Sequence, residues 1–199
     1  PEEGVSPEDS FLVGEEELIV EELINVKNNF NIQFFIDKDK SIYCIGYGIQ
    51  ITTDDGEYEG TICFLNNDPN PKLLEVTNDA CANIAERGYF GFLGFDVLED
   101  DNGDYYIVDA NIRINGSTSV HLIKDKLLPK LGDYAYMTSF DLGAESPTEA
   151  IEKISEYGIL LSLSHKEQGK YKAFAMFAVE TNKPEDAISK VNEFLEANK

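Results

Sequence analysis

The chain has 199 residues, 42% of them hydrophobic and 11% aromatic, enough to build one large domain or a domain with a smaller appendage. Its formal net charge of −22 repels phosphate backbones and anionic lipids, so we expect neither nucleic-acid nor membrane binding. No apolar run approaches the roughly 20 residues that span a bilayer, and no signal-peptide pattern is present.

Short runs rich in β-branched and aromatic residues predict strands in the first third of the chain, over residues 18–24, 31–36, 41–46 and 61–64. Asp37 to Lys40 predicts a turn between two of them. A helix is expected to begin at Pro71 with Asn70 as its cap and to end near Gly88. Next come a hairpin, over residues 92–98 and 105–111, and a helix over residues 117–128.

The last third changes character. Ser146-Pro147-Thr148-Glu149 is typical of a capped helix start, and Gly158 predicts where that helix ends. Strands over residues 159–163 and 172–179 and a helix over 184–197 follow. We therefore predict an α+β fold, with an antiparallel sheet in residues 1–132 and helices on one face of it. Residues 133–199 are predicted to form a small α/β appendage.

The three cysteines, Cys44, Cys63 and Cys81, are odd in number and far apart, and none belongs to a CxxC or Cys/His pattern. Their spacing supports neither a zinc site nor a disulfide framework. We expect small buried side chains in a protein of the reducing cytoplasm.

The predicted hairpin holds the candidate site. Asn102-Gly103 between two apolar runs predicts a two-residue type I′ loop. Counting back from that loop pairs Leu98 with Ile107, Val97 with Val108, and Asp96 with Asp109. The two carboxylates then lie directly opposite on one face, with Cβ atoms about 4.5–5.5 Å apart.

Asn111 lies two residues beyond Asp109, so strand alternation puts it on the same face, paired with Gly94 above open space. Two facing carboxylates repel, and a bound cation removes the conflict. With the amide oxygen of Asn111 they make an all-oxygen set suited to Mg²⁺ or Mn²⁺. The alternative is a solvated hairpin face with scattered acids, with Val97, Val108 and Ala110 buried.

Asp96, Asp109 and Asn111, followed by Arg113, resemble the metal-ligand signature of the ATP-grasp ligases, with Asp109 where that family usually has Glu. The resemblance implies the C-terminal lobe of an ATP-grasp fold and a catalytic Arg113 that contacts the transferred phosphate or a substrate carboxylate. It also implies that Gly116 and Ser117, just before a helix, offer backbone N–H groups to an anion of ATP.

Residues 18–24 resemble the family's interlobe strand, which implies adenine contacts at Glu22 and Ile24. The family's Gly-rich loop and phosphate-binding lysines would precede this strand, and residues 1–16 contain no Lys or Arg. We therefore expect a missing N-terminal segment of the same protein to complete the nucleotide site.

Two functional hypotheses remain open. In the first, the parent protein is an ATP- and Mg²⁺-dependent ligase that joins a small-molecule or peptide carboxylate to an amine through an acylphosphate, and this chain alone is inactive. In the second, the chain is a non-catalytic metal- or nucleotide-binding or assembly module of the same fold.

Overall fold

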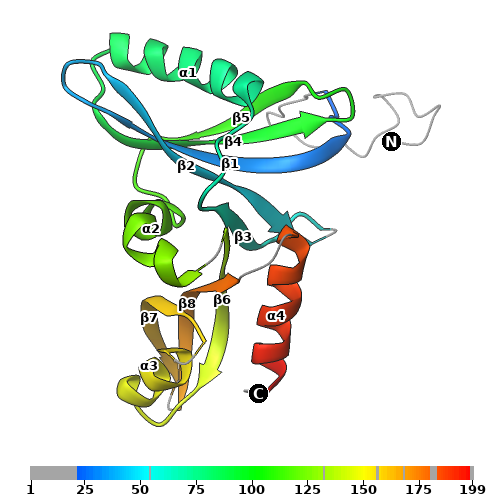
Figure 1. Ribbon diagram of the computed structural model, residues 1–199, viewed down its shortest axis with the longest axis vertical. Coiled ribbons are helices and arrows are strands. Elements are labelled where there is room, and N and C mark those ends of the chain that lie inside the picture. The colour runs from blue at the N-terminus through cyan, green and yellow to red at the C-terminus, as the bar shows by residue number, and fades with distance from the viewer. Residues whose placement is uncertain are drawn as a thin grey trace, which may run out of the picture.

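The computed structural model describes residues 22–53, 55–131, 133–155, 157–167, 169–179 and 183–197. Eight antiparallel strands form one continuous sheet in the order β5-β4-β1-β2-β3-β6-β8-β7 (Figure 1). The strands are β1 Val26–Ile36, β2 Ile42–Thr52, β3 Tyr58–Phe64, β4 Gly91–Asp100, β5 Tyr105–Asn111, β6 Tyr134–Gly143, β7 Ile159–Glu167 and β8 Lys170–Val179. The helices are α1 Pro71–Glu86, α2 Thr118–Leu131, α3 Pro147–Ser155 and α4 Pro184–Ala197.

Most predicted elements are confirmed. Asn70 caps α1, its side chain accepting a hydrogen bond from the Lys72 N–H at 2.9 Å, and Gly88 follows the helix with a positive φ of 90°. Of the strand predicted over 18–24, residues 18–21 lie outside the described residues. Residues 22–24 belong to no strand, because pairing with β4 begins at Val26.

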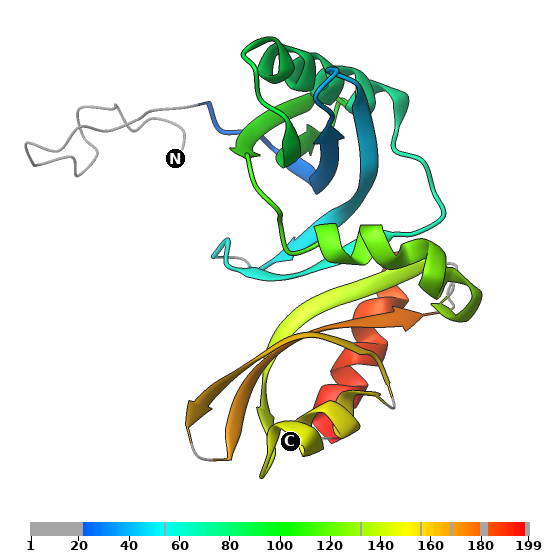
Figure 2. The same ribbon diagram turned by 90° about the vertical axis from the view of Figure 1, so that its left-hand side faces the viewer.

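The prediction that helices cover one face of the sheet is wrong for α2. On β6, Tyr136, Phe140 and Leu142 point into a core cluster with α3 and α4. Met137, between them in the strand alternation, packs with Val120 of α2. Following the register from β6 to β1 puts α1 on the same face as α3 and α4. The helix α2 therefore covers the opposite face, between the two halves of the molecule (Figure 2).

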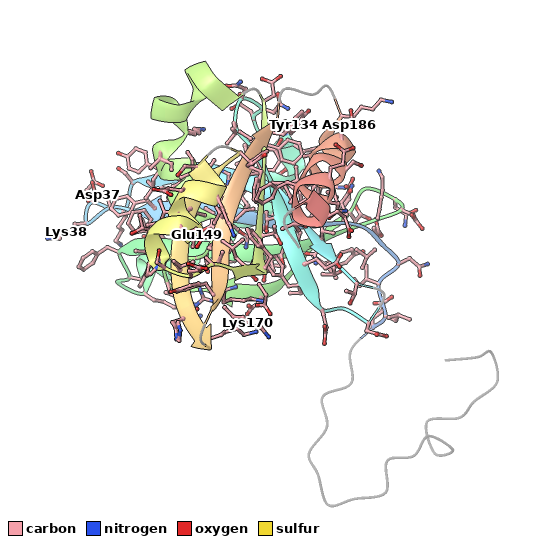
Figure 3. The ribbon with its side chains drawn as sticks, turned by 90° about the horizontal axis from the view of Figure 1, so that it is seen from below. Asp37, Lys38, Tyr134, Glu149, Lys170 and Asp186 are labelled. Atoms are coloured by element: carbon pink, nitrogen blue, oxygen red, sulfur yellow. The ribbon has the colours of Figure 1, made fainter. Side chains whose placement is uncertain are left out.

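Residues 133–199 continue the sheet rather than forming a second one, since β6 pairs with β3 from Tyr134↔Phe64 to Thr138↔Gly60. The division between residues 132 and 133 stays a prediction. Seen from below, the turn at Asp37 and Lys38 lies at one side of the molecule and Asp186 of α4 at another (Figure 3).

Cys63 and Cys81 are buried as expected, but Cys44 is exposed. The reason is strand length: β3 pairs with β2 only as far as Tyr47, so Cys44 extends beyond its neighbour. Within the described residues, no helix is long and apolar enough to cross a membrane.

Candidate functional site

The β4–β5 hairpin brings the predicted acids together. Asp96 lies directly opposite Asp109, and Gly94 lies opposite Asn111. These residues share the sheet face on which α2 packs, the face opposite α1. The alternation inferred from the sequence therefore holds where the site lies.

The loop of this hairpin differs from the prediction. Asp100, not Asp101, closes it: the Asp100 N–H donates to the carbonyl of Asp104 at 3.0 Å. The Asp100 carboxylate also accepts the backbone N–H groups of Asn102 at 2.9 Å and Asp104 at 2.8 Å, and Gly103 has a φ of 77°. These side-chain hydrogen bonds stabilise a three-residue loop over the two-residue type I′ loop.

The wider loop shifts the pairing near it by one residue, so Val97 meets Ile107 and Leu98 meets Tyr106. An irregularity between Asp96 and Val97 leaves Val108 without a direct partner. This bulge restores the predicted pairing of Asp96 with Asp109. Val108 is exposed, so the alternative hypothesis, which placed Val108 on a buried face, is wrong at this residue.

Asp96 is partly buried and held by two amides. Its Oδ1 accepts hydrogen bonds from Asn31 Nδ2 at 2.6 Å and from Gln50 Nε2 at 2.7 Å. Burial raises the pKa of Asp96 above its ordinary value, and the Asp109 charge adds to that rise, whereas the hydrogen bonds from Asn31 and Gln50 oppose it. Oδ1 is therefore fixed, while Oδ2 faces the partner strand.

Asn111 lies between the two carboxylates. Its Nδ2 donates to Asp109 Oδ2 at 2.8 Å and, more weakly, to Asp96 Oδ2 at 3.5 Å. Arg113 donates to the Asn111 and Asn115 side-chain oxygens at 2.8 and 2.9 Å and to the Ile114 carbonyl at 3.2 Å. These three acceptors are all neutral.

The donor set fits a divalent cation. Two carboxylate oxygens converge on one amide, and an amide can present its oxygen instead of its nitrogen. Nowhere in the described ranges do three His, Cys, Asp or Glu side chains gather as a metal site, so the third protein ligand here would be Asn111. Mg²⁺ is commonly held by one or two carboxylates together with waters and substrate phosphates.

A buried polar network beneath the acids was not anticipated from the sequence. Gln33, only 1% exposed, donates to Asn31 Oδ1 and to Ser117 Oγ and accepts from Asn115 Nδ2 at 3.1 Å and Thr118 Oγ1 at 2.8 Å. Ser117 Oγ also donates to Asn31 Oδ1 at 2.9 Å. Both donors reach the Asn31 oxygen, which turns the Asn31 amide nitrogen toward Asp96.

A sequence signal for this network exists. Asn31 and Gln33 alternate with Phe30, Ile32 and Phe34, which marks a polar strand face. Such a face ordinarily points to water, and only the packing of the loop at residues 115–118 shows that it is buried.

The prediction of open space above Gly94 is wrong, because side chains fill that space. A Cβ atom there would lie 2.5 Å from Asn115 Nδ2 and 3.0 Å from Gln33 Nε2. Glycine is needed so that these two side chains can cross the strand.

The loop residues Gly116 and Ser117 lie at the same site, and α2 begins directly after them at Thr118. Behind them His121 of α2 is buried against Gly46, and neither of its ring nitrogens has a hydrogen-bond partner among the residues that the structure describes. Burial, aided by the Lys124 charge, lowers the pKa of His121 to about 4, so the ring is neutral at pH 7.

The site surrounds a cavity of about 360 Å³. It is lined by Asn31, Gln50, Tyr58, Thr61, Asp96, Asp109, Asn111, Arg113, Asn115, Gly116, Ser117, Met137 and Phe174. Glu22 and Ile24 lie elsewhere, in a cavity of about 340 Å³ beside Asp100, Asn102 and Tyr106. Contacts between these two residues and adenine stay a prediction.

A family model described as "L-aspartate–L-methionine ligase, ATP grasp" matches residues 9–111, just over half of the chain. The chain belongs to this family of ATP-grasp ligases. The match ends at Asn111 and includes both Asp96 and Asp109. The predicted fold class, an antiparallel α+β ATP-grasp lobe, is confirmed.

Solved structures share the ATP-grasp fold at low identity. N5-carboxyaminoimidazole synthetase from Staphylococcus aureus, complexed with ADP, matches with a TM-score of 0.58 and 13% identity over 90% of this chain and 52% of that one. The phosphoribosylaminoimidazole carboxylase ATPase subunit from Aquifex aeolicus matches with a TM-score of 0.59 and 15% identity, over 90% of this chain and 58% of that one. L-amino acid ligase from Bacillus licheniformis matches with a TM-score of 0.57 and 12% identity, over 86% of this chain and 53% of that one. This ATP-grasp chain thus spans about half the length of these proteins.

Proposed function

We propose that the whole protein is an ATP- and Mg²⁺-dependent ligase that joins the carboxylate of one amino acid to the amine of another, with aspartate and methionine as the substrate pair. The family description and the L-amino acid ligase of the same fold support this substrate class. The observation that carries the proposal is the convergence of Asp96 and Asp109 on Asn111, beside Arg113, at one cavity. Because the chain spans about half of its solved relatives, activity is proposed for the whole protein and not for these residues alone.

In this proposal Asp96, Asp109 and Asn111 hold the cation. Bound there, it would neutralise the phosphates of ATP and orient them for attack by the substrate carboxylate. The buried amides of Asn31 and Gln50 keep the Asp96 carboxylate in one orientation. This leaves Oδ2 as the oxygen that faces Asn111.

Arg113 would stabilise the negative charge that develops on the transferred phosphate or bind the carboxylate that attacks it. The guanidinium donates only to neutral oxygens among its described hydrogen bonds, so an anion would be a stronger partner for it. No nucleophilic side chain is needed, because the substrate's own carboxylate attacks the γ-phosphate of ATP and releases ADP, and the amine then attacks the resulting acylphosphate and releases phosphate.

The first experiment titrates Mn²⁺ into the chain and follows the loss of free-ion signal by electron paramagnetic resonance. One site is expected in the wild type and none in Asp109→Ala. Asp104→Ala removes an exposed acid of the same hairpin that does not line the cavity, so it should bind like the wild type. Equal Mn²⁺ binding by Asp109→Ala and the wild type would reject the metal site.

The second experiment measures ADP release by the whole protein with aspartate and methionine, together and singly. ADP release that needs both amino acids is expected, with loss in Arg113→Ala. Release of ADP without a new amide product would reject the ligase assignment.

A further inference from the structure

The cavity has a polar end and an apolar end. The polar end contains Asp96, Asp109 and Arg113, whereas the apolar end is formed by Met137 of β6 and Phe174 of β8. Both apolar residues come from residues 133–199, the part of the chain predicted to be an appendage. They reach the site because β6 pairs with β3, which places Met137 directly opposite Thr61.

The loop that follows Arg113 closes tightly on this apolar end. A Cβ atom at Gly116 would lie 3.2 Å from Phe174 Cζ and 3.6 Å from Met137 Cε. Met137 is buried and Phe174 is half-buried, and both line the cavity. Arg113, Gly116 and Phe174 therefore line one continuous space.

We propose that Met137 and Phe174 bind the apolar side chain of one amino-acid substrate, of the methionine type, and so determine its selection. This inference rests on the proposed function. An ionised aspartate side chain would lose its water at the apolar end without gaining a charged partner there, which is unfavourable. A thioether loses little there and gains a sulfur–aromatic contact with Phe174. The α-carboxylate of the same amino acid would lie toward Arg113, at the polar end.

The chain's own methionines provide the test, since it has two, Met137 and Met176. They are cross-strand partners, but Met137 lines the cavity, whereas Met176 is buried and does not. In a sample with ¹³C-labelled methionine methyl groups, unlabelled L-methionine should shift the Met137 signal saturably and more than the Met176 signal. L-aspartate should not. No Met137 shift with L-methionine, or an equal shift with L-aspartate, would overturn the inference.

A pair of variants tests the role of Phe174. Phe174→Leu should weaken L-methionine binding roughly two- to tenfold, as expected for loss of a sulfur–aromatic contact. Phe177→Leu is the control, because Phe177 lies on the opposite face of the same strand, in the core cluster with α3 and α4. Equal weakening by both variants would assign the effect to stability and reject the inference.

Mn²⁺ separates this inference from the proposed function. Bound at Asp96 and Asp109, it should broaden the Met137 signal in the wild type and not in Asp109→Ala. Broadening without an effect of L-methionine overturns the inference and keeps the metal site. An effect of L-methionine without broadening by Mn²⁺ keeps the apolar subsite and overturns the metal site.

Discussion

Both faces of strand β1 are buried, but the side chains on each face are held by different interactions. Phe30, Ile32 and Phe34 pack with α1 and β4 in an apolar cluster, where contacts have little direction. Asn31 and Gln33, between them, are just as inaccessible but are held by hydrogen bonds to named partners. The apolar face supplies stability that tolerates small shifts, whereas the polar face fixes the orientation of Asp96.

The largest effect should come from the apolar face. Phe34→Ala removes a fully buried ring and should lower the free energy of unfolding by about 3–5 kcal/mol in urea titrations. The Mn²⁺ affinity of the protein that stays folded should not change. Loss of Mn²⁺ binding without loss of stability would show that the two faces are not separable.

Lowering the pH should destabilise the folded protein through His121. Its pKa of about 4 in the folded state is below the ordinary value of 6.5, so between these pH values the unfolded chain binds the extra proton. The contribution of His121 to the free energy of unfolding is fully present above pH 6.5. It falls by about 3 kcal/mol as the pH drops toward 4. Urea titrations from pH 7 to 4 should show this loss in the wild type relative to His121→Leu.

The control for His121 is His165→Leu, which removes the chain's other histidine, an exposed residue. This variant should follow the wild-type pH profile. Identical profiles for His121→Leu and the wild type would contradict the assignment of a buried neutral ring.

A smaller stability effect, with a larger effect on the site, is expected for Gln33→Leu. It removes the Gln33 acceptor of Asn115 Nδ2 and Thr118 Oγ1, while Ser117 keeps its hydrogen bond to Asn31, at a cost of about 1–3 kcal/mol. It also removes one of the two hydrogen bonds that orient the Asn31 amide, so Mn²⁺ should bind more weakly. Ile32→Val, on the opposite face, should cost about 0.5–1.5 kcal/mol and leave Mn²⁺ binding intact.

The smallest effect should come from the surface. Lys72 and Asp104 form an ion pair with an N–O distance of 2.5 Å, and both side chains are about half exposed, at 51% and 53%. Water and salt screen such pairs, so Lys72→Met should not measurably move the urea midpoint. A clear loss of stability would show that the hairpin depends on surface charge as well as on buried contacts.

Local patterns were sufficient for much of the fold. The cap at Asn70, the turn at residues 37–40 and the helix start at Pro147 depend on neighbouring residues, and each was predicted. The pairing of Asp96 with Asp109 was also predicted, but two errors cancelled there. The loop is one residue longer than expected, and the bulge at Val108 compensates for it.

The sequence by itself determined most of the helices and strands, though not β6, and the shared face of Asp109 and Asn111, because capping and strand alternation act over a few residues. Only the tertiary structure decided that Asn31 and Gln33 are buried and that α2 covers their face. It alone brought Met137 and Phe174 to the cavity, through the pairing of β3 with β6. Strand pairing and buried hydrogen bonds join residues far apart in the chain, so no local pattern specifies their partners.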